Sequence, residues 1–263
     1  MMRVYLKNLR KQWRGGIMPP LSIALFVPII ASIWPTLKEQ AASFQELLKN
    51  PIYKAFLGQV VDISTWQGVY FMYIFVWMEW ILIFASIFFP VRIISREVEK
   101  KTLDIALSYP IPRWRYILEK FSSYLTFNLL YPIILLPLSY FVTEGIGEVM
   151  NYTLVGYSLI GVWFLLFALG SMGLLCSSIF LDSGRSTALA AVLVLGQYIT
   201  LKVGQLTESV SWVKQFSMFN YLNYNTIIEL GYLPTDELII VTAVGVITLL
   251  VALYLFQRRE LAY

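Results

Sequence analysis

The sequence predicts an all-α protein that crosses a membrane several times. Of its 263 residues, 58% are hydrophobic and only 14% are charged, and the mean hydropathy is +0.68. A soluble domain normally carries about 25% charged residues. Apolar runs of about 18 or more residues, each long enough to cross a bilayer, recur from one end of the chain to the other. No stretch of about 100 residues remains for a soluble domain, so residues 1–263 are predicted to form a single membrane domain.

The residue types that are missing exclude several kinds of site. The sequence has no histidine, which excludes imidazole metal sites and histidine general bases. Cys176 is the only cysteine, so no intrachain disulfide can form, and its apolar surroundings favour a packing role. No phosphate-binding GxxxxGK[ST] motif occurs. We therefore expect no catalytic residue, metal site or cofactor in this chain, and any ATP must bind to another chain.

Residues 1–16 predict a helix that lies in the membrane interface. Apolar and basic side chains alternate there in a loosely amphipathic pattern, which suits anionic lipid headgroups. Gly15 and Gly16 are expected to turn the chain into the bilayer. A cleaved signal peptide is the alternative, but the apolar run of residues 17–37 is longer than the core of about 7–15 residues that such peptides have.

The hydrophobic pattern predicts six spans, at about residues 17–37, 67–91, 117–142, 152–181, 186–203 and 237–257. Three prolines fall inside these spans: Pro28, Pro132 and Pro137. They predict kinks and not breaks, because neighbouring helices can satisfy the carbonyls that proline leaves unpaired. Small residues in the fourth span permit close helix packing, with the lining of a substrate path as the alternative; they are Gly170, Ser171, Gly173, Ser177 and Ser178.

The basic residues predict the orientation of the spans. If the N-terminus is cytoplasmic, 15 of the 20 Lys and Arg residues fall on the cytoplasmic side, as the positive-inside rule requires. The outer side then receives Lys38, Lys49, Lys54, Lys202 and Lys214. We expect a multi-pass protein of the cell membrane with both termini in the cytoplasm. The basic balance reflects the inner membrane face, and no nucleic-acid partner is expected.

Two outer segments, residues 38–66 and 204–236, alternate apolar and polar residues at nearly helical spacing. Neither is uniformly apolar enough to span a bilayer, so both are predicted to be amphipathic helices at the outer leaflet. Residues 204–236 are rich in aromatic side chains. They are interpreted either as a lid over a translocation path or as interfacial anchors.

The densest charge cluster lies between the second and third spans, in residues 92–116. Thr102 is a plausible N-cap of a short helix, and Pro110 must end that helix. Leu103 and Leu107 lie on it at a spacing that gives the helix apolar residues to bury. Two interpretations follow: a solvated loop whose charges set topology, or a helix parallel to the membrane that docks onto a cytoplasmic partner.

The pattern in this segment resembles the signature of type 2 ABC permeases, the membrane subunits of drug, lipid, peptide and polysaccharide exporters. The matching residues, ahead of Lys120 in the next span, are Glu97, Glu99, Thr102, Leu103, Leu107, Ser108, Pro110 and Arg113. The closing run FQRREL, from Phe256 to Leu261, is similar to the end of those permeases. One residue departs from the pattern: Lys101 stands where the family has glycine.

The resemblance implies that Thr102–Ser108 is a coupling helix seated in a cleft of an ATP-binding subunit. It implies two such subunits, with ATP and magnesium bound there, and a second permease copy in a homodimer or heterodimer. The loop between spans four and five would make a secondary contact through Asp182 and Arg185, with a simple polar turn as the alternative. A self-contained secondary transporter or channel is the alternative function, and a membrane-embedded enzyme lacks obvious chemistry.

Polar residues inside the spans are further candidates. An ionised Glu79 near the middle of span two costs about 2.5–3.5 kcal/mol even on low insertion scales. We expect Glu79 either to take part in substrate or ion passage or to make an interhelical hydrogen bond. Asn128 in span three and Gln197 in span five are weaker cases, for which an interhelical hydrogen bond is favoured over a substrate contact; Asn128 is kept as a candidate for the path.

Overall fold

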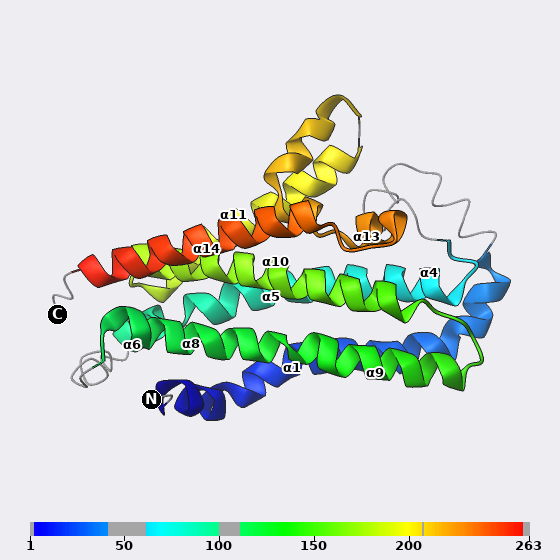
Figure 1. The fold of residues 1–263 in the computed structure, drawn as a ribbon, viewed down its shortest axis with the longest axis horizontal. Helices are drawn as coiled ribbons and strands as arrows, with labels where there is room; N and C mark the ends of the chain where they lie inside the picture. Colours follow the sequence, from blue (N-terminus) through cyan, green and yellow to red (C-terminus); the bar gives the residue numbers. More distant parts are fainter. Residues whose placement is uncertain (1–2, 42–61, 100–110, 207, 260–263) are drawn as a thin grey trace.

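The computed structural model describes residues 3–41, 62–99, 111–206 and 208–259. Within these residues, six helices are long and apolar enough to cross a membrane, and no strand occurs among them. Figure 1 shows the helices side by side along the long axis, with the two ends of the chain at the same end of the bundle. The predicted all-α, six-span fold is confirmed.

The six spans agree closely with the predicted ones. They are α1 (Arg3–Glu39), the continuous run α4 (Trp66–Tyr70), η1 (Phe71–Phe75) and α5 (Val76–Val91), the pair α8 (Arg113–Asn128) and α9 (Leu130–Gly145), α10 (Tyr152–Ile179), α11 (Ser183–Leu206) and α14 (Thr235–Arg258). The shorter elements are α6 (Ser95–Glu99), the 3-10 helix η2 (Glu208–Phe216), α12 (Met218–Tyr221) and α13 (Tyr224–Leu230). Of the predicted outer segment 38–66, the structure describes only the two ends.

Most basic residues of the described chain gather where the termini lie, and we call this the basic end. It holds the start of α1, α6, the start of α8, the connection between α10 and α11, and the end of α14 (Figure 1). Its described basic residues include Lys7, Arg10, Lys11, Arg14, Arg92, Arg96, Arg113, Arg115, Arg185, Arg258 and Arg259.

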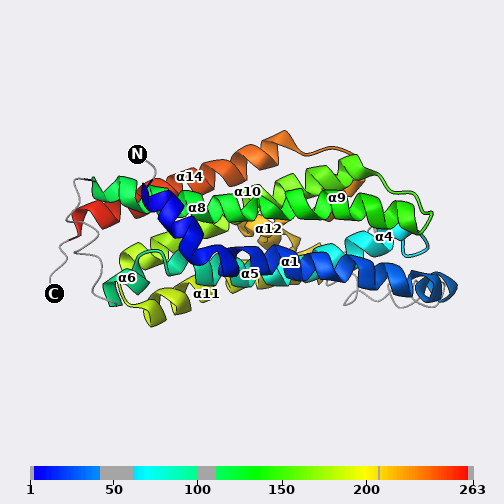
Figure 2. The same cartoon turned by 90° about the horizontal axis from the view of Figure 1, so that it is seen from below.

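The predicted interfacial helix and the first span form one helix, α1. Figure 2 shows α1 bending close to its N-terminal end. The cause lies in the sequence, because Pro19 and Pro20 lack the N–H groups that would bond to the carbonyls of Gly15 and Gly16. The bend therefore lies close to the predicted position, but the helix continues through it.

The third span is divided at Leu129, between α8 and α9. Pro132 lies three residues further on and cannot donate to the carbonyl of Asn128. The Leu129 N–H still bonds to the carbonyls of Leu125 and Thr126, at 3.2 Å each, so the interruption is local. The kink predicted from Pro132 appears here as a one-residue break.

Helix α10 lies at the centre of the bundle and contacts α5, α8, α9, α11, α13 and α14. The small residues predicted to allow close packing are all buried. Ser177 Oγ donates a hydrogen bond to the carbonyl of Val91 at 2.6 Å, which joins α10 to α5 where the backbones come close. These residues pack helices together, as the sequence predicts.

Replacing Gly173 by alanine is expected to destabilise the protein. A Cβ atom at Gly173 would lie 2.9 Å from the carbonyl oxygen of Ser86 and 3.3 Å from Cβ of Pro90, so the helices must separate. Overpacking of this kind typically costs about 1–3 kcal/mol. Gly196→Ala is the matched control, because a Cβ there meets nothing within 4 Å. Thermal unfolding of the purified variants should separate the two, and equal midpoints would contradict the prediction.

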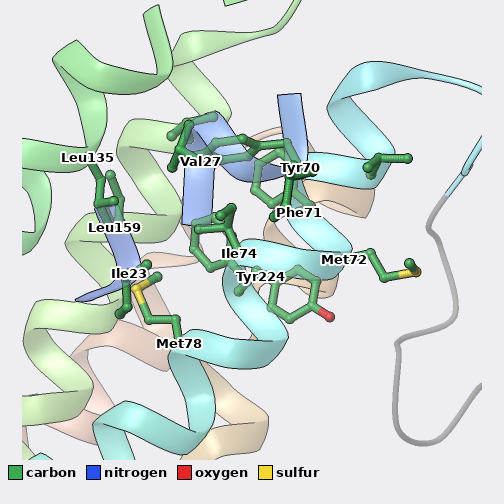
Figure 3. Packing of buried hydrophobic residues seen from close by; sticks show 14 of the residues in the cluster. Ile23, Val27, Tyr70, Phe71, Met72, Ile74, Met78, Leu135, Leu159 and Tyr224 are labelled. Carbon is green, nitrogen blue, oxygen red and sulfur yellow. The ribbon is translucent and has the colours of Figure 1, made fainter. Parts of the chain in front are cut away.

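The part of the core that lies away from the basic end is rich in aromatic side chains (Figure 3). Tyr70 and Phe71 of the second span pack with Val27 of α1, Leu159 of α10 and Tyr224 of α13, and all five are buried. The rings of Phe71 and Tyr224 are stacked, with centroids 6.3 Å apart. The short helix α13 therefore packs into the core through Tyr224 and Ile227.

The aromatic residues of segment 204–236 thus divide between two environments. Phe219 of α12 is buried, as is Tyr224, whereas Trp212 and Phe216 of η2 are 60% and 73% exposed. Figure 1 shows the end of α11 and η2 standing out from the bundle as a hairpin. The segment therefore has a packed part in α12 and α13 and an exposed part in η2, and the lid and the interfacial anchor both stay predictions.

At the end opposite the basic end, Glu148, which lies between α9 and α10, binds two residues of α1. Lys38 Nζ lies 2.8 Å from Glu148 Oε1, and Trp34 Nε1 donates to the same oxygen at 2.9 Å. The Lys38 ammonium, followed by the Trp34 indole N–H, holds the pKa of Glu148 below its usual value. This contact stabilises the fold above the unfolded-state pKa of the carboxyl, and the stabilisation is lost as the pH falls through the lower folded-state value.

Candidate functional site

The predicted coupling segment lies largely outside the described residues. Those that fall there are Lys101, Thr102, Leu103, Leu107 and Pro110. Its two flanks are described: α6 carries Glu97 and Glu99, and Arg113 begins α8. Both flanks lie at the basic end (Figure 1). Their contacts determine how the ends of the segment are held.

Glu97 is bonded to α8. Its carboxylate forms an ion pair with Lys120 and accepts a hydrogen bond from the Tyr116 hydroxyl. Lys120 is buried, and its Nζ also donates to the carbonyl of Ile93 at 3.3 Å. The glutamate and the lysine of the predicted signature, far apart in sequence, thus form one contact that holds α6 against the third span.

Glu99 joins α6 to the connection between α10 and α11. Its Oε1 accepts a hydrogen bond from the backbone N–H of Ser183 at 2.9 Å. In the same turn, Asp182 Oδ1 accepts from the backbone N–H of Arg185 at 2.7 Å, so Asp182 caps α11. The structure therefore brings Glu99, on the described flank of the coupling segment, next to the predicted secondary loop.

The C-terminal arginines connect the remaining parts of the basic end. Arg113 Nη1 donates to the carbonyl of Arg259 at 2.9 Å, and Arg259 Nη1 donates to the carbonyl of Ser178 at 2.6 Å. Arg259 thereby satisfies a carbonyl in the last turn of α10. The sequence indicated Arg259 only as part of the closing pattern; its bond to α10 is visible only in the fold.

Removing Lys120 is expected to weaken the fold more than removing an exposed lysine or arginine. Lys120→Met leaves the Glu97 carboxylate without its buried cation, and breaking a buried pair costs about 3–5 kcal/mol. Arg115→Met is the control, since its pair with Glu119 on the same helix is more exposed and is worth about 1 kcal/mol or less. Denaturant unfolding in detergent measures both losses of stability. Similar values would show that the Glu97–Lys120 pair contributes no more than an exposed pair.

Glu79 is paired inside the membrane-spanning region. Its Oε2 lies 3.3 Å from Nζ of Lys202 on α11, and both residues are 8% exposed. Lys202 Nζ also lies 5.1 Å from the ring centroid of Tyr198. The charge count put Lys202 among the outer basic residues; in the fold its side chain is buried, and a buried lysine is tolerated there because Glu79 faces it. The sequence shows an acidic residue in one span and a basic residue in another, but their spacing along the chain does not predict that the two side chains meet.

The two residues proposed for a substrate path do not share a cavity. Glu79 borders a small enclosed space, together with Ser158 of α10 and Phe219 of α12. Asn128 is buried and lines a separate, much larger cavity between α1, α5, α8 and α9. Gln197 bonds through its Oε1 to the backbone N–H of Met218 at 3.1 Å, as an interhelical contact of the expected kind.

Comparison with known proteins agrees with this arrangement. The model of the ABC-2 family transporter proteins matches residues 7–261, which is nearly the whole chain and includes both the predicted coupling segment and the closing arginines. The search of curated proteins finds no match. With its six apolar helices and this family match, the chain is a multi-pass membrane protein and belongs to the ABC-2 family of transporter proteins.

Proposed function

We propose that this chain is the permease subunit of an ATP-driven ABC exporter. The family match over residues 7–261 carries the proposal. ATP and magnesium bind to a separate ATPase subunit, present in two copies, and a second permease copy completes the transporter. The chain contributes the membrane path and no catalytic residue. Drug-like, lipid or peptide-like cargo moves outward.

The contacts at the basic end support the coupling part of this proposal. Motion imposed on the segment between Glu99 and Arg113 reaches α8 through Glu97, α11 through Glu99, and the end of α14 through Arg113. A partner seated there can therefore move three spans at once. The positive-inside rule supports a cytoplasmic position for this end, the side of the cell membrane on which ATP is available.

Reconstitution tests the proposal directly. The chain is co-expressed with an ATP-binding subunit encoded beside it, purified through a tag on the permease, and placed in vesicles. We expect the ATPase to co-purify and ATP hydrolysis to drive transport away from the ATP-containing side. Failure of any ATP-binding subunit to associate would contradict the proposal.

A secondary transporter or channel is the alternative, and the buried Glu79–Lys202 pair favours it, because such proteins carry paired charges at membrane depth. Transport by vesicles that contain the permease alone would support this alternative. Transport that requires both ATP and the second subunit would exclude it.

A further inference from the structure

A cavity of about 670 Å³ opens between α1, α5, α8 and α9. Its volume lies in the range of small-molecule sites, about 300–1,000 Å³. The wall is mostly apolar: Leu21 and Leu25 of α1 face Phe84 and Phe88 of α5 across it. All four of these side chains are at least 41% exposed, so the cavity opens to the outside of the bundle.

One end of the cavity is cationic. Lys11, Arg92 and Arg96 line it, and all three are exposed. The Arg92 guanidinium lies 5.5 Å from the ring centroid of Phe88, which holds this charge at the cavity. The ion pairs found among the described residues are Lys38–Glu148, Arg115–Glu119, Lys120–Glu97 and Lys202–Glu79. The three cations of the cavity therefore belong to no ion pair within that part of the chain, and an anion fits there.

Two buried polar groups border the apolar part of the cavity. The Tyr131 side chain is 1% exposed, and its hydroxyl makes no hydrogen bond within the described part of the chain. Asn128 is 5% exposed and lines the same wall. A buried hydroxyl normally has a partner, and an acceptor that reached the Tyr131 hydroxyl from the cavity would supply the one that the described part of the chain does not.

The dimensions fit one membrane leaflet. The stretch of α5 from Ile81 to Arg92, both in the cavity wall, covers about 16 Å at 1.5 Å per residue. Half of a hydrocarbon core is about 15 Å. Phe127, next to Asn128, packs against Phe89, which lies three residues before Arg92, so Asn128 lies about one helical turn along the cavity from this cation.

We propose that this cavity binds an anionic phospholipid from the leaflet at the basic end. The phosphate binds Lys11, Arg92 and Arg96, an ester carbonyl accepts a hydrogen bond from Tyr131, and an acyl chain lies along Phe84 and Leu25. Basic pockets between membrane helices recognise anionic headgroups in this way. The proposal is independent of ATP-driven export, because it concerns the purified chain alone.

Native mass spectrometry of the full-length protein tests this, with phosphatidylglycerol and phosphatidylcholine of identical acyl chains as probes. We expect phosphatidylglycerol to bind about tenfold tighter than phosphatidylcholine. Arg92→Gln should weaken phosphatidylglycerol binding about fivefold and leave phosphatidylcholine binding unchanged. Arg258→Gln is the matched control, because Arg258 is also exposed and also lies over an aromatic ring, Tyr254, but does not line the cavity.

A second pair of variants tests the cavity itself. Gly15→Phe fills it and should reduce binding of both lipids, whereas Gly196→Phe should not; a Cβ atom meets nothing within 4 Å at either glycine. Equal binding of the two lipids, or equal effects of Arg92→Gln and Arg258→Gln, would overturn the proposal. So would a Gly15→Phe variant that dissociates a dimer while keeping its lipid, since the cavity would then belong to a second copy of the chain. The exposed Arg92 can be replaced without loss of folding, so the charge test stands if Gly15→Phe does not fold.

Discussion

Replacing both Leu103 and Leu107 by aspartate is expected to abolish association with the ATP-binding subunit. In the predicted helix these two leucines are the apolar residues that a partner would bury. Burying a leucine is worth about 1.5–3 kcal/mol, and burying an aspartate in its place adds a large desolvation penalty. The two leucines together contribute about 3–6 kcal/mol, most of the roughly 8 kcal/mol that holds a micromolar complex, and the desolvation of two aspartates removes the rest. Co-purification through a tagged permease measures the loss.

The control for this experiment keeps the apolar surface. Leu103→Met with Leu107→Met preserves size and hydrophobicity, so this variant should retain the ATPase. Both variants should elute from size-exclusion chromatography as the native protein does, because Glu97, Glu99 and Arg113 hold the flanks of the segment independently of the leucines. If the aspartate variant co-purified normally, the segment would not be the coupling site.

Breaking the Glu79–Lys202 pair is expected to produce a large loss of stability, comparable with the loss expected for Lys120→Met. Lys202→Met leaves a buried carboxylate without its cation, which costs about 3–5 kcal/mol. The double variant Glu79→Gln with Lys202→Met removes both charges and should recover most of that loss. Unfolding midpoints of the two single variants and the double variant complete the cycle.

An exposed pair provides the comparison for this cycle. Lys38–Glu148 has the same chemistry, but the Lys38 side chain is 56% exposed, so its coupling should be about 1 kcal/mol or less. If the two cycles gave equal coupling energies, the inner pair would be solvated and not buried. A transport measurement on Glu79→Gln tests whether the carboxylate also has a role in transport. Unchanged transport at every pH would exclude a role for it in the substrate path.

Several local features of the fold follow directly from particular residues. Pro19 and Pro20 explain why α1 bends, and Pro132 explains why the third span divides at Leu129. Asn151 begins α10 by accepting hydrogen bonds from two backbone N–H groups of its first turn. Gly231, with φ of +75°, ends α13 in the left-handed conformation that glycine favours. Such features depend on a few neighbouring residues, so they can be predicted locally.

The candidate site was predictable only in part. The signature residues Glu97 and Lys120 were identified from sequence, but their ion pair required the fold. Lys202 was counted among the outer basic residues because a lysine near the end of a span normally reaches water, and only the position of Glu79 on α5 shows why this side chain is buried. The large cavity depends on how α1 lies against α5 and α8, which no spacing within one helix reveals.

The sequence by itself determined the class, the number of spans and the family, because the bilayer requires each span to be long, apolar and internally hydrogen-bonded whatever its neighbours are. Only the tertiary structure decided which spans lie inside the bundle. In the most apolar stretch of α10, 72% of the residues are buried, but in that of α14 only 17% are, although the α14 stretch has the higher mean hydropathy. Lipid and protein interior are both apolar, so hydrophobicity cannot distinguish them. Close contacts at Gly170 and Gly173 of α10, and the pairing of the buried charges of α5 and α11, are specific interactions that hold these spans inside the bundle.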